Sequence, residues 1–152
     1  MSIEIGSPAP DFSLKNQHGE DVVLSELRGR NVALVFFPFA FSGICTGELC
    51  EIRDNIGAFA DGDVEVLAIS CDHFFSNRAF ADAEGLTFSV LSDFWPHGEV
   101  SRAYGIFNED AGAPERGTYL IDAEGVVRWK VEHPIGEARD FAAYRAALAD
   151  LA

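Results

Sequence analysis

The sequence carries little positive charge. Its 152 residues contain 11 Lys and Arg against 25 Asp and Glu, and the formal net charge is −14. A chain this acidic repels polyanions, so we expect no nucleic-acid partner and no binding to an anionic membrane surface. The sequence also lacks an apolar run of about 18 residues, the length that a membrane-spanning helix needs. Residues 1–4 show no basic and apolar pattern of the kind that directs export, so we expect no secretory signal.

Cysteine is scarce as well. The three cysteines, Cys45, Cys50 and Cys71, cannot all pair in a disulfide framework, and without an export signal they suggest a reducing, cytoplasmic environment. The chain has no Cys-x-x-Cys pair and no paired histidine spacing, so we predict no metal site and no cofactor. Although Asp72 and His73 follow Cys71, we expect Cys71 to be a packed thiol at the end of a strand.

Apolar residues make up 48% of the chain and are spread along its whole length. We therefore expect a single domain over residues 1–152, which buries roughly 68–70% of its unfolded surface. Unbroken apolar runs predict two buried strands, at residues 32–37 and 64–70. The remaining expected elements are a helix at 74–84 that ends at Gly85, a short strand near 88–91, a short helix at 100–104, a hairpin of 118–122 with 126–132, and a last helix at 138–149.

This order of elements indicates the fold class. Strand, helix, strand and helix followed by a hairpin and a helix predict an α/β protein with a parallel half and an antiparallel half. That is the thioredoxin-like order, in which helices flank a central mixed sheet.

The stretch Pro38-Phe39-Ala40-Phe41-Ser42-Gly43-Ile44-Cys45 organises the rest of the chain. It follows the first buried strand, and beyond it the apolar residues Leu49, Ile52, Ile56 and Phe59 recur at the spacing of a long helix. Ser42 is a good N-cap residue, which places Cys45 at the third helical position. The free N–H groups and the positive dipole end of a helix favour an anion there. The turn therefore presents a thiolate.

The pattern Pro38-x-x-x-Ser42-x-x-Cys45 resembles the active-site pattern of peroxiredoxins, and the resemblance covers nearly the whole chain. It includes the motifs Ala9-Pro10-Asp11-Phe12, Leu91-Ser92-Asp93, Ala103-Tyr104-Gly105 and Arg116-Gly117-Thr118. Residues 36–41, 92–98 and 116–118 most resemble the AhpE one-cysteine subgroup. The resemblance implies a thiol-dependent peroxidase that reduces hydrogen peroxide and organic hydroperoxides. Its expected partners are a peroxide, a small thiol reductant such as thioredoxin or mycoredoxin, and a second copy in a homodimer.

The resemblance also implies roles for individual residues. Cys45 would be the peroxidatic nucleophile, which becomes a sulfenic acid. The hydroxyl of Ser42 would hold the attacked peroxide oxygen in line. Arg116, from a separate strand, would keep the sulfur anionic and stabilise charge on the departing oxygen. The ring of Pro38 would shield the sulfur from water, and Glu48 would orient Arg116.

Cys50 departs from the one-cysteine subgroup. Its spacing from Cys45 resembles the resolving arrangement of the PrxQ (bacterioferritin-comigratory) subgroup, in which the two sulfurs form a disulfide bond. Five residues of helix give about 7.5 Å of rise and about 140° of rotation, so the Cα atoms would lie roughly 8–9 Å apart. That exceeds the ~7 Å limit for a disulfide, so the first turns must unwind, which Gly47 makes easier. The alternative is a one-cysteine cycle in which Cys50 is a structural thiol.

Two other functions remain open on sequence grounds. A thioredoxin-like thiol-disulfide oxidoreductase without peroxidase activity is disfavoured because the helix start has no Cys-x-x-Cys. A non-catalytic interaction module on this fold is disfavoured because Pro38, Ser42, Cys45 and Arg116 occur together. The aromatic pair Phe94-Trp95 fits the core, a lid over the site or a dimer face equally well.

Overall fold

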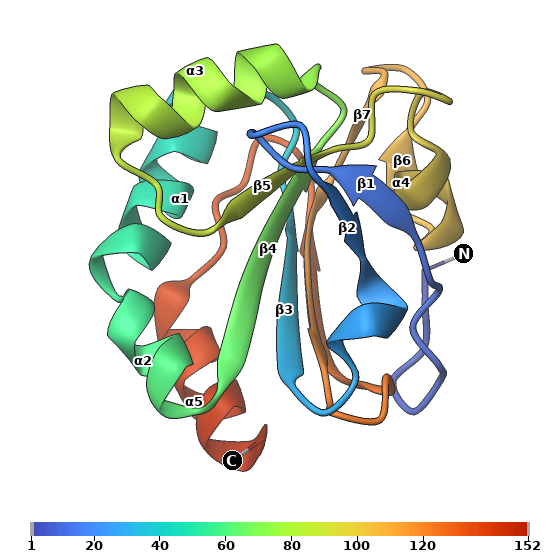
Figure 1. The fold of residues 1–152 in the computed structure, drawn as a ribbon, viewed down its shortest axis with the longest axis vertical. Helices are drawn as coiled ribbons and strands as arrows, with labels where there is room; N and C mark the ends of the chain where they lie inside the picture. The colour runs from blue at the N-terminus through green and yellow to red at the C-terminus, as the bar shows by residue number, and fades with distance from the viewer. Residues whose placement is uncertain (1, 152) are drawn as a thin grey trace.

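The computed structural model describes residues 2–151, which form a seven-stranded sheet with helices on both faces (Figure 1). The order of strands in the sheet is β2-β1-β5-β4-β3-β8-β9. The bounds of these strands are β1 Ser13–Lys15, β2 Asp21–Val23, β3 Asn31–Phe36, β4 Val64–Ser70, β5 Ser89–Ser92, β8 Arg116–Ile121 and β9 Val127–His133. The short strands β6 Phe107–Asn108 and β7 Ala113–Pro114 pair separately.

The helices complete the architecture. Their bounds are η1 Leu24–Leu27, α1 Gly43–Asp54, α2 Ile56–Asp61, α3 Phe74–Glu84, α4 Glu99–Ala103 and α5 Phe141–Leu151. In Figure 1, α1, α2, α3 and α5 lie on one side of the sheet, and α4 lies on the other with the N-terminal segment. Among residues 2–151, no helix is long and apolar enough to cross a membrane.

The pairing of the strands confirms the predicted fold class. Strand β3 runs parallel to β4, and β4 runs parallel to β5. On its other edge β3 pairs antiparallel with β8, and β8 pairs antiparallel with β9. The sheet is therefore mixed, with helices flanking it, as the thioredoxin-like order of the sequence predicts.

The apolar run in β3 is continuous because both faces of this central strand are covered. Ala33, Val35 and Phe37 belong to the core beneath α1, α2, α3 and α5. The alternate residues Val32 and Leu34 belong to the core on the other face. This two-sided burial holds β3 rigidly, and its end, where Phe37 is fully buried, leads directly into the turn that carries Cys45.

Some element boundaries differ from the sequence prediction. The long helix expected through Phe59 is interrupted at Asn55, whose φ of −117° and ψ of 21° leave the helical region. The Asn55 side chain donates to the Glu51 carbonyl, which helps to end α1. The last helix begins at Phe141 rather than at residue 138, because Arg139 is drawn into the protein interior. The β6–β7 pair was not predicted.

Candidate active site

Cys45 lies at the third position of α1, as predicted. Ser42 precedes the helix in an extended conformation, with φ −69° and ψ 149°, and its carbonyl accepts from the Thr46 N–H at 2.9 Å. Its side chain, however, makes no capping hydrogen bond. The Cys45 side chain is fully buried in the core between the sheet and helices α1, α2, α3 and α5. The strand-to-helix turn thus delivers a thiol to the interior at the end of β3.

Arg116 reaches Cys45 because β8 runs antiparallel to β3, so the start of one strand lies beside the end of the other. The Arg116 side chain is 2% exposed. Its Nη1 donates to Cys45 Sγ at 3.2 Å and to Glu48 Oε1 at 2.7 Å. Its Nε donates to the Ile135 carbonyl at 2.6 Å, which fixes the plane of the guanidinium. The structure therefore brings together Cys45, Glu48 and Arg116, as the sequence predicts.

A second arginine, Arg139, completes the cluster and was missed in the sequence. Its backbone N–H and its Nε donate to Glu48 Oε2 at 2.6 and 3.1 Å, and its Nη2 donates to Glu48 Oε1 at 2.9 Å. Its Nη1 donates to the carbonyls of Phe36 and Gly117 at 2.8 and 2.9 Å. No local pattern marks Arg139, because its partner Glu48 lies 91 residues away in the chain.

The charges of this cluster leave a net positive charge beside the Cys45 sulfur. Two buried guanidinium groups face one carboxylate, so one positive charge is left for the sulfur to balance. Burial by itself would raise the pKa of Glu48, but the hydrogen bonds and charge of Arg139, with the charge of Arg116, lower it below its ordinary value. Away from water these interactions are strong, because little solvent screens them.

The loop before α1 has the properties of a prepared binding site. Pro38 is buried at its start, and the Ala40 N–H donates to Asp72 Oδ2 at 2.9 Å, which ties the loop to the end of β4. Phe41 adopts a φ of 71°, a region that a bulky side chain occupies only when its surroundings impose it. Within residues 2–151, Ser42 Oγ is the buried side-chain polar atom without a partner, so it is available to a ligand.

The other two cysteines do not join this cluster, and all three are free thiols. Cys50 Sγ donates to Glu84 Oε1 on α3 at 3.4 Å. Cys71 is buried at the end of β4, with Asp93 Oδ2 and Ser101 Oγ each 4.0 Å from its sulfur. Burial, with the charge of Asp93, raises the pKa of Cys71 to about 12, so this thiol stays protonated.

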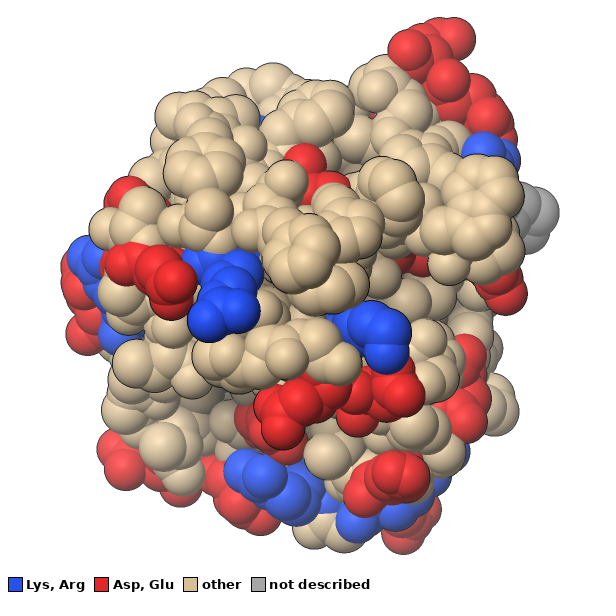
Figure 2. Space-filling view, turned by 45° about the horizontal axis from the view of Figure 1, so that its top comes forward, with Lys and Arg blue, Asp and Glu red and all other residues tan. Residues whose placement is uncertain are grey.

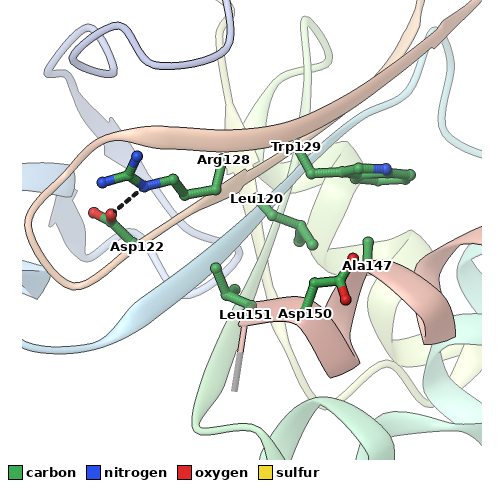
Figure 3. Close-up of a pocket in the computed structure, with 7 residues that line it drawn as sticks. All are labelled: Leu120, Asp122, Arg128, Trp129, Ala147, Asp150 and Leu151. Carbon is green, nitrogen blue, oxygen red and sulfur yellow. Dashed lines mark hydrogen bonds and ion pairs between the residues drawn. The ribbon is translucent and has the colours of Figure 1, made fainter.

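No group of His, Cys, Asp or Glu side chains suited to a metal ion occurs among the described residues. A surface hollow of about 300 Å³ lies between β8, β9 and α5 (Figure 3). Its lining residues are Leu120, Asp122, Arg128, Trp129, Ala147, Asp150 and Leu151. Figure 3 shows Arg128 turned toward Asp122, to which it is hydrogen-bonded. No cysteine lines this hollow.

Known proteins resemble this protein in sequence and in fold. The model of the AhpC/TSA family matches residues 5–130. The chain is similar to alkyl hydroperoxide reductase E of Mycobacterium tuberculosis, with 47% identity over 150 residues that cover 98% of each chain. It is similar to peroxiredoxin Bcp of Bacillus subtilis, with 34% identity over 91% of this chain and 94% of the relative. The crystal structure of Enterococcus faecalis AhpC superposes with a TM-score of 0.90 at 23% identity, covering 99% of this chain and 92% of that one.

The chain therefore belongs to the AhpC/TSA family. Its relative Bcp of Bacillus subtilis is a peroxiredoxin. The protein is a thiol-dependent peroxidase, which takes a peroxide as substrate and a thiol as reductant. Both the resemblance to the AhpE subgroup and the predicted enzyme class are thus confirmed.

Proposed function

We propose that this peroxidase reduces hydrogen peroxide and organic hydroperoxides at Cys45, and that Ser42, Arg116, Glu48 and Pro38 form the site around it. The observation that carries the proposal is the contact from Arg116 Nη1 to Cys45 Sγ at 3.2 Å. That contact holds a cation on the sulfur within a buried cluster whose charges balance only when Cys45 is a thiolate. A thiolate, and not a thiol, attacks the O–O bond.

The reaction needs one sulfur, one peroxide and one proton. The Cys45 thiolate attacks one peroxide oxygen, the S–O bond forms as the O–O bond breaks, and the departing oxygen leaves as an alcohol or water after it gains the proton. The sulfur is oxidised to a sulfenic acid. Arg116 stabilises the negative charge that develops on the departing oxygen, and the free hydroxyl of Ser42 Oγ holds the peroxide in line.

Glu48 and Arg139 act through Arg116. Glu48 accepts from Arg116 at 2.7 Å and from Arg139 at 2.9 Å on the same oxygen, so it fixes the position of the guanidinium that contacts the sulfur. The side chain of Arg139 is 1% exposed. It donates hydrogen bonds to backbone carbonyls at the end of β3 and at the start of β8. These two residues are therefore positioning residues, and Pro38 limits the access of water to the sulfur.

A reductant must return the sulfenic acid to the thiolate. We propose that Cys50 resolves it as an intramolecular disulfide, which a small thiol donor such as thioredoxin or mycoredoxin then reduces. The alternative is a one-cysteine cycle, in which the external thiol attacks Cys45 directly. Measuring the Cys45–Cys50 disulfide after one equivalent of hydrogen peroxide separates the two cycles. Turnover by a thiol donor requires a reducing compartment, so a cytoplasmic location is part of the proposal.

We also propose that the protein is a homodimer. Exposed apolar side chains gather at the end of the molecule that carries the Cys45 loop, and we call them the aromatic face: Phe39, Phe41, Ile44, Phe75, Phe94 and Trp95. Ring contacts of His73 with Phe75 and Phe94, at 5.1 and 5.0 Å, connect its parts. Figure 2 shows this end as a mainly uncharged surface with few acidic groups near its centre. Each copy has a net charge of −14, so the electrostatic repulsion between two copies is smallest when they meet through the aromatic face.

The assignment of the nucleophile is tested with a pair of cysteine variants. Cys45→Ser should abolish rapid peroxide consumption, because no other thiolate sits beside a buried cation. Cys71→Ser is the matched control and should keep most activity, because Cys71 remains a protonated thiol. Peroxide consumption with a thiol donor, and mass spectrometry of the sulfenic acid trapped by dimedone, measure both. Activity retained in Cys45→Ser and lost in Cys71→Ser would contradict the proposal.

A further inference from the structure

Cys50 lies where α1 passes the C-terminal end of α3. Its sulfur donates to Glu84 Oε1 at 3.4 Å. Arg53, three residues further along α1, donates its Nη1 to the backbone carbonyl of the same Glu84. Glu84 is the last residue of α3, before Gly85 ends the helix in the left-handed conformation. Two adjacent contacts therefore fasten α1 to one residue of α3.

The contact with Glu84 requires the protonated form of Cys50. A thiol can donate to a carboxylate, whereas a thiolate at the same distance would be repelled by it. Burial first, and then the hydrogen bond that the thiol donates to Glu84, raise the pKa of Cys50 above its ordinary value. Of the charged groups that face it from α1, Asp54 adds to this effect and Arg53 opposes it.

The folded helix also keeps Cys50 away from Cys45. Helix α1 runs without interruption from Gly43 to Asp54, so both cysteines share one regular helix. Their Cα atoms are then roughly 8–9 Å apart and on different sides of it, beyond the ~7 Å that a disulfide spans. Cys45 is fully buried in the core, whereas Cys50 faces α3. A bond between them requires the first turns of α1 to unwind.

We propose that Glu84 is a positioning residue of the catalytic cycle, which holds Cys50 as a protonated thiol against α3 while α1 is wound and releases it as a nucleophile only when α1 unwinds. The inference rests on the proposed function, since it needs a sulfenic acid at Cys45. The released Cys50 thiolate attacks the Cys45 sulfur, the S–S bond forms, and the S–O bond breaks. Hydroxide leaves and takes up a proton to become water.

This arrangement couples unwinding to pH. The wound state binds the Cys50 proton more tightly than the unwound state does, because only the wound state buries the thiol and has the Glu84 contact. Below the ordinary thiol pKa of about 8.5, Cys50 is protonated in both states and pH has no effect on unwinding through this group. As pH rises above that value, Cys50 ionises only in the unwound state, so unwinding becomes easier.

The first experiment measures Cys50 alone. In a Cys45→Ser, Cys71→Ser background, the rate of alkylation by iodoacetamide is followed over a pH series. Glu84→Gln should move the half-point of the profile to lower pH and speed alkylation below it by about three- to tenfold. Asp82→Asn is the matched control, because Asp82 is an exposed acid on the same helix, and it should leave the profile unchanged. An unchanged profile in Glu84→Gln would overturn the inference.

The second experiment measures disulfide formation in the Cys71→Ser protein after one equivalent of hydrogen peroxide, by rapid quench and mass spectrometry. With Glu84 present, the rate should rise with pH as the thiolate fraction grows, and it should go on rising above about pH 8.5 because unwinding then becomes easier. In Glu84→Gln it should be faster at neutral pH and depend less on pH. An equal acceleration at every pH would reduce Glu84 to a structural contact and overturn the inference.

The outcomes also separate this inference from the proposed function. A sulfenic acid at Cys45 that persists beside a free Cys50 thiol, with and without Glu84, overturns the release of Cys50 and leaves the peroxidase intact. Failure of hydrogen peroxide to oxidise Cys45 at all contradicts the proposed function itself. Glu84→Asp provides a second variant, which keeps the charge but shortens the side chain, and it should shift the alkylation profile less than Glu84→Gln.

Discussion

Arg139 carries a buried positive charge, and protein groups accept its hydrogen bonds. Its guanidinium bonds Glu48, the carbonyls of Phe36 and Gly117, and Thr118 Oγ1 at 3.1 Å. A lysine has no planar fork of donors, so it cannot reach these acceptors together. Because a buried carboxylate without its cation is costly, Arg139 stabilises the fold and the position of Arg116 at once.

We therefore predict that Arg139→Met lowers the free energy of unfolding by about 3–5 kcal/mol, because it removes one of the two cations that pair with the buried Glu48 and leaves two carbonyls without this donor. Arg139→Lys should restore part of this loss. The matched control is Arg145→Met, since Arg145 is exposed on α5, where it donates a hydrogen bond to the Asn55 side chain and lies over the Phe141 ring; it should cost less than about 1 kcal/mol. Urea unfolding measures all three. Equal losses in the two Met variants would show that the buried cluster adds no stability.

The elements follow from sequence wherever local signals agree with the fold. The apolar runs of β3 and β4, the N-cap position of Ser42 and the ending of α3 at Gly85 were all predicted, because each depends on neighbours in the chain. The break at Asn55 was not predicted. The apolar spacing continues through it, and only the backbone angles of Asn55 and its bond to Glu51 interrupt the helix.

The site shows the same division between local and long-range information. Cys45 and Ser42 lie in one turn, and their arrangement is visible in the spacing of the sequence. Arg116 was found only through the resemblance, and Arg139 was not found at all. Both reach the site through strand pairing and an irregular segment before α5, and such contacts between distant residues leave no periodic signal.

Helix α1 holds a further prediction, because Gly47 lies between the two cysteines. A Cβ added at Gly47 meets nothing within 4 Å. Gly47→Ala should therefore stabilise α1 by up to about 1 kcal/mol. If Cys50 resolves by unwinding of this helix, disulfide formation should slow by about fivefold, since the wound state is favoured by that amount. Rapid-quench mass spectrometry after one equivalent of peroxide measures the rate.

The control for this change is Gly57→Ala in α2. A Cβ at Gly57 also meets nothing within 4 Å, so the substitution should add similar stability. Gly57 lies beyond the break at Asn55, outside the segment that must unwind. Disulfide formation should then keep its wild-type rate in Gly57→Ala. A similar slowing in both variants would mean that resolution depends on global stability and not on α1.

At the scale of the whole molecule, charge and apolar surface are separated. Because each copy of the protein has a net charge of −14, two copies repel each other electrostatically. The aromatic face is the exception, because Trp95 is 82% exposed, Phe41 57% and Phe75 65%. The sequence left Phe94 and Trp95 open among core, lid and dimer face, and their exposure excludes the core. Exposing this apolar surface to water is unfavourable in free energy, and burying it against a second copy removes that penalty.

A homodimer through the aromatic face predicts how one substitution acts. Trp95→Glu leaves the folded monomer intact, because the side chain is largely in solvent. It would bury a carboxylate without a partner in the proposed interface, so dimer affinity should fall by at least about 30-fold, or roughly 2 kcal/mol. Ile5→Glu is the matched control, since Ile5 is an exposed apolar residue (56%) outside this face. Sedimentation velocity at several protein concentrations follows the dimer.

Salt gives an independent measure of the same interface. If two acidic copies meet through an uncharged face, their long-range repulsion weakens as ions screen it, over about 10 Å at 0.1 M salt. Added salt should therefore strengthen the wild-type dimer, whereas a dimer held by ion pairs would weaken. A wild-type protein that sediments as a monomer at every concentration, or an Ile5→Glu variant that dissociates as readily as Trp95→Glu, would contradict a dimer formed through the aromatic face.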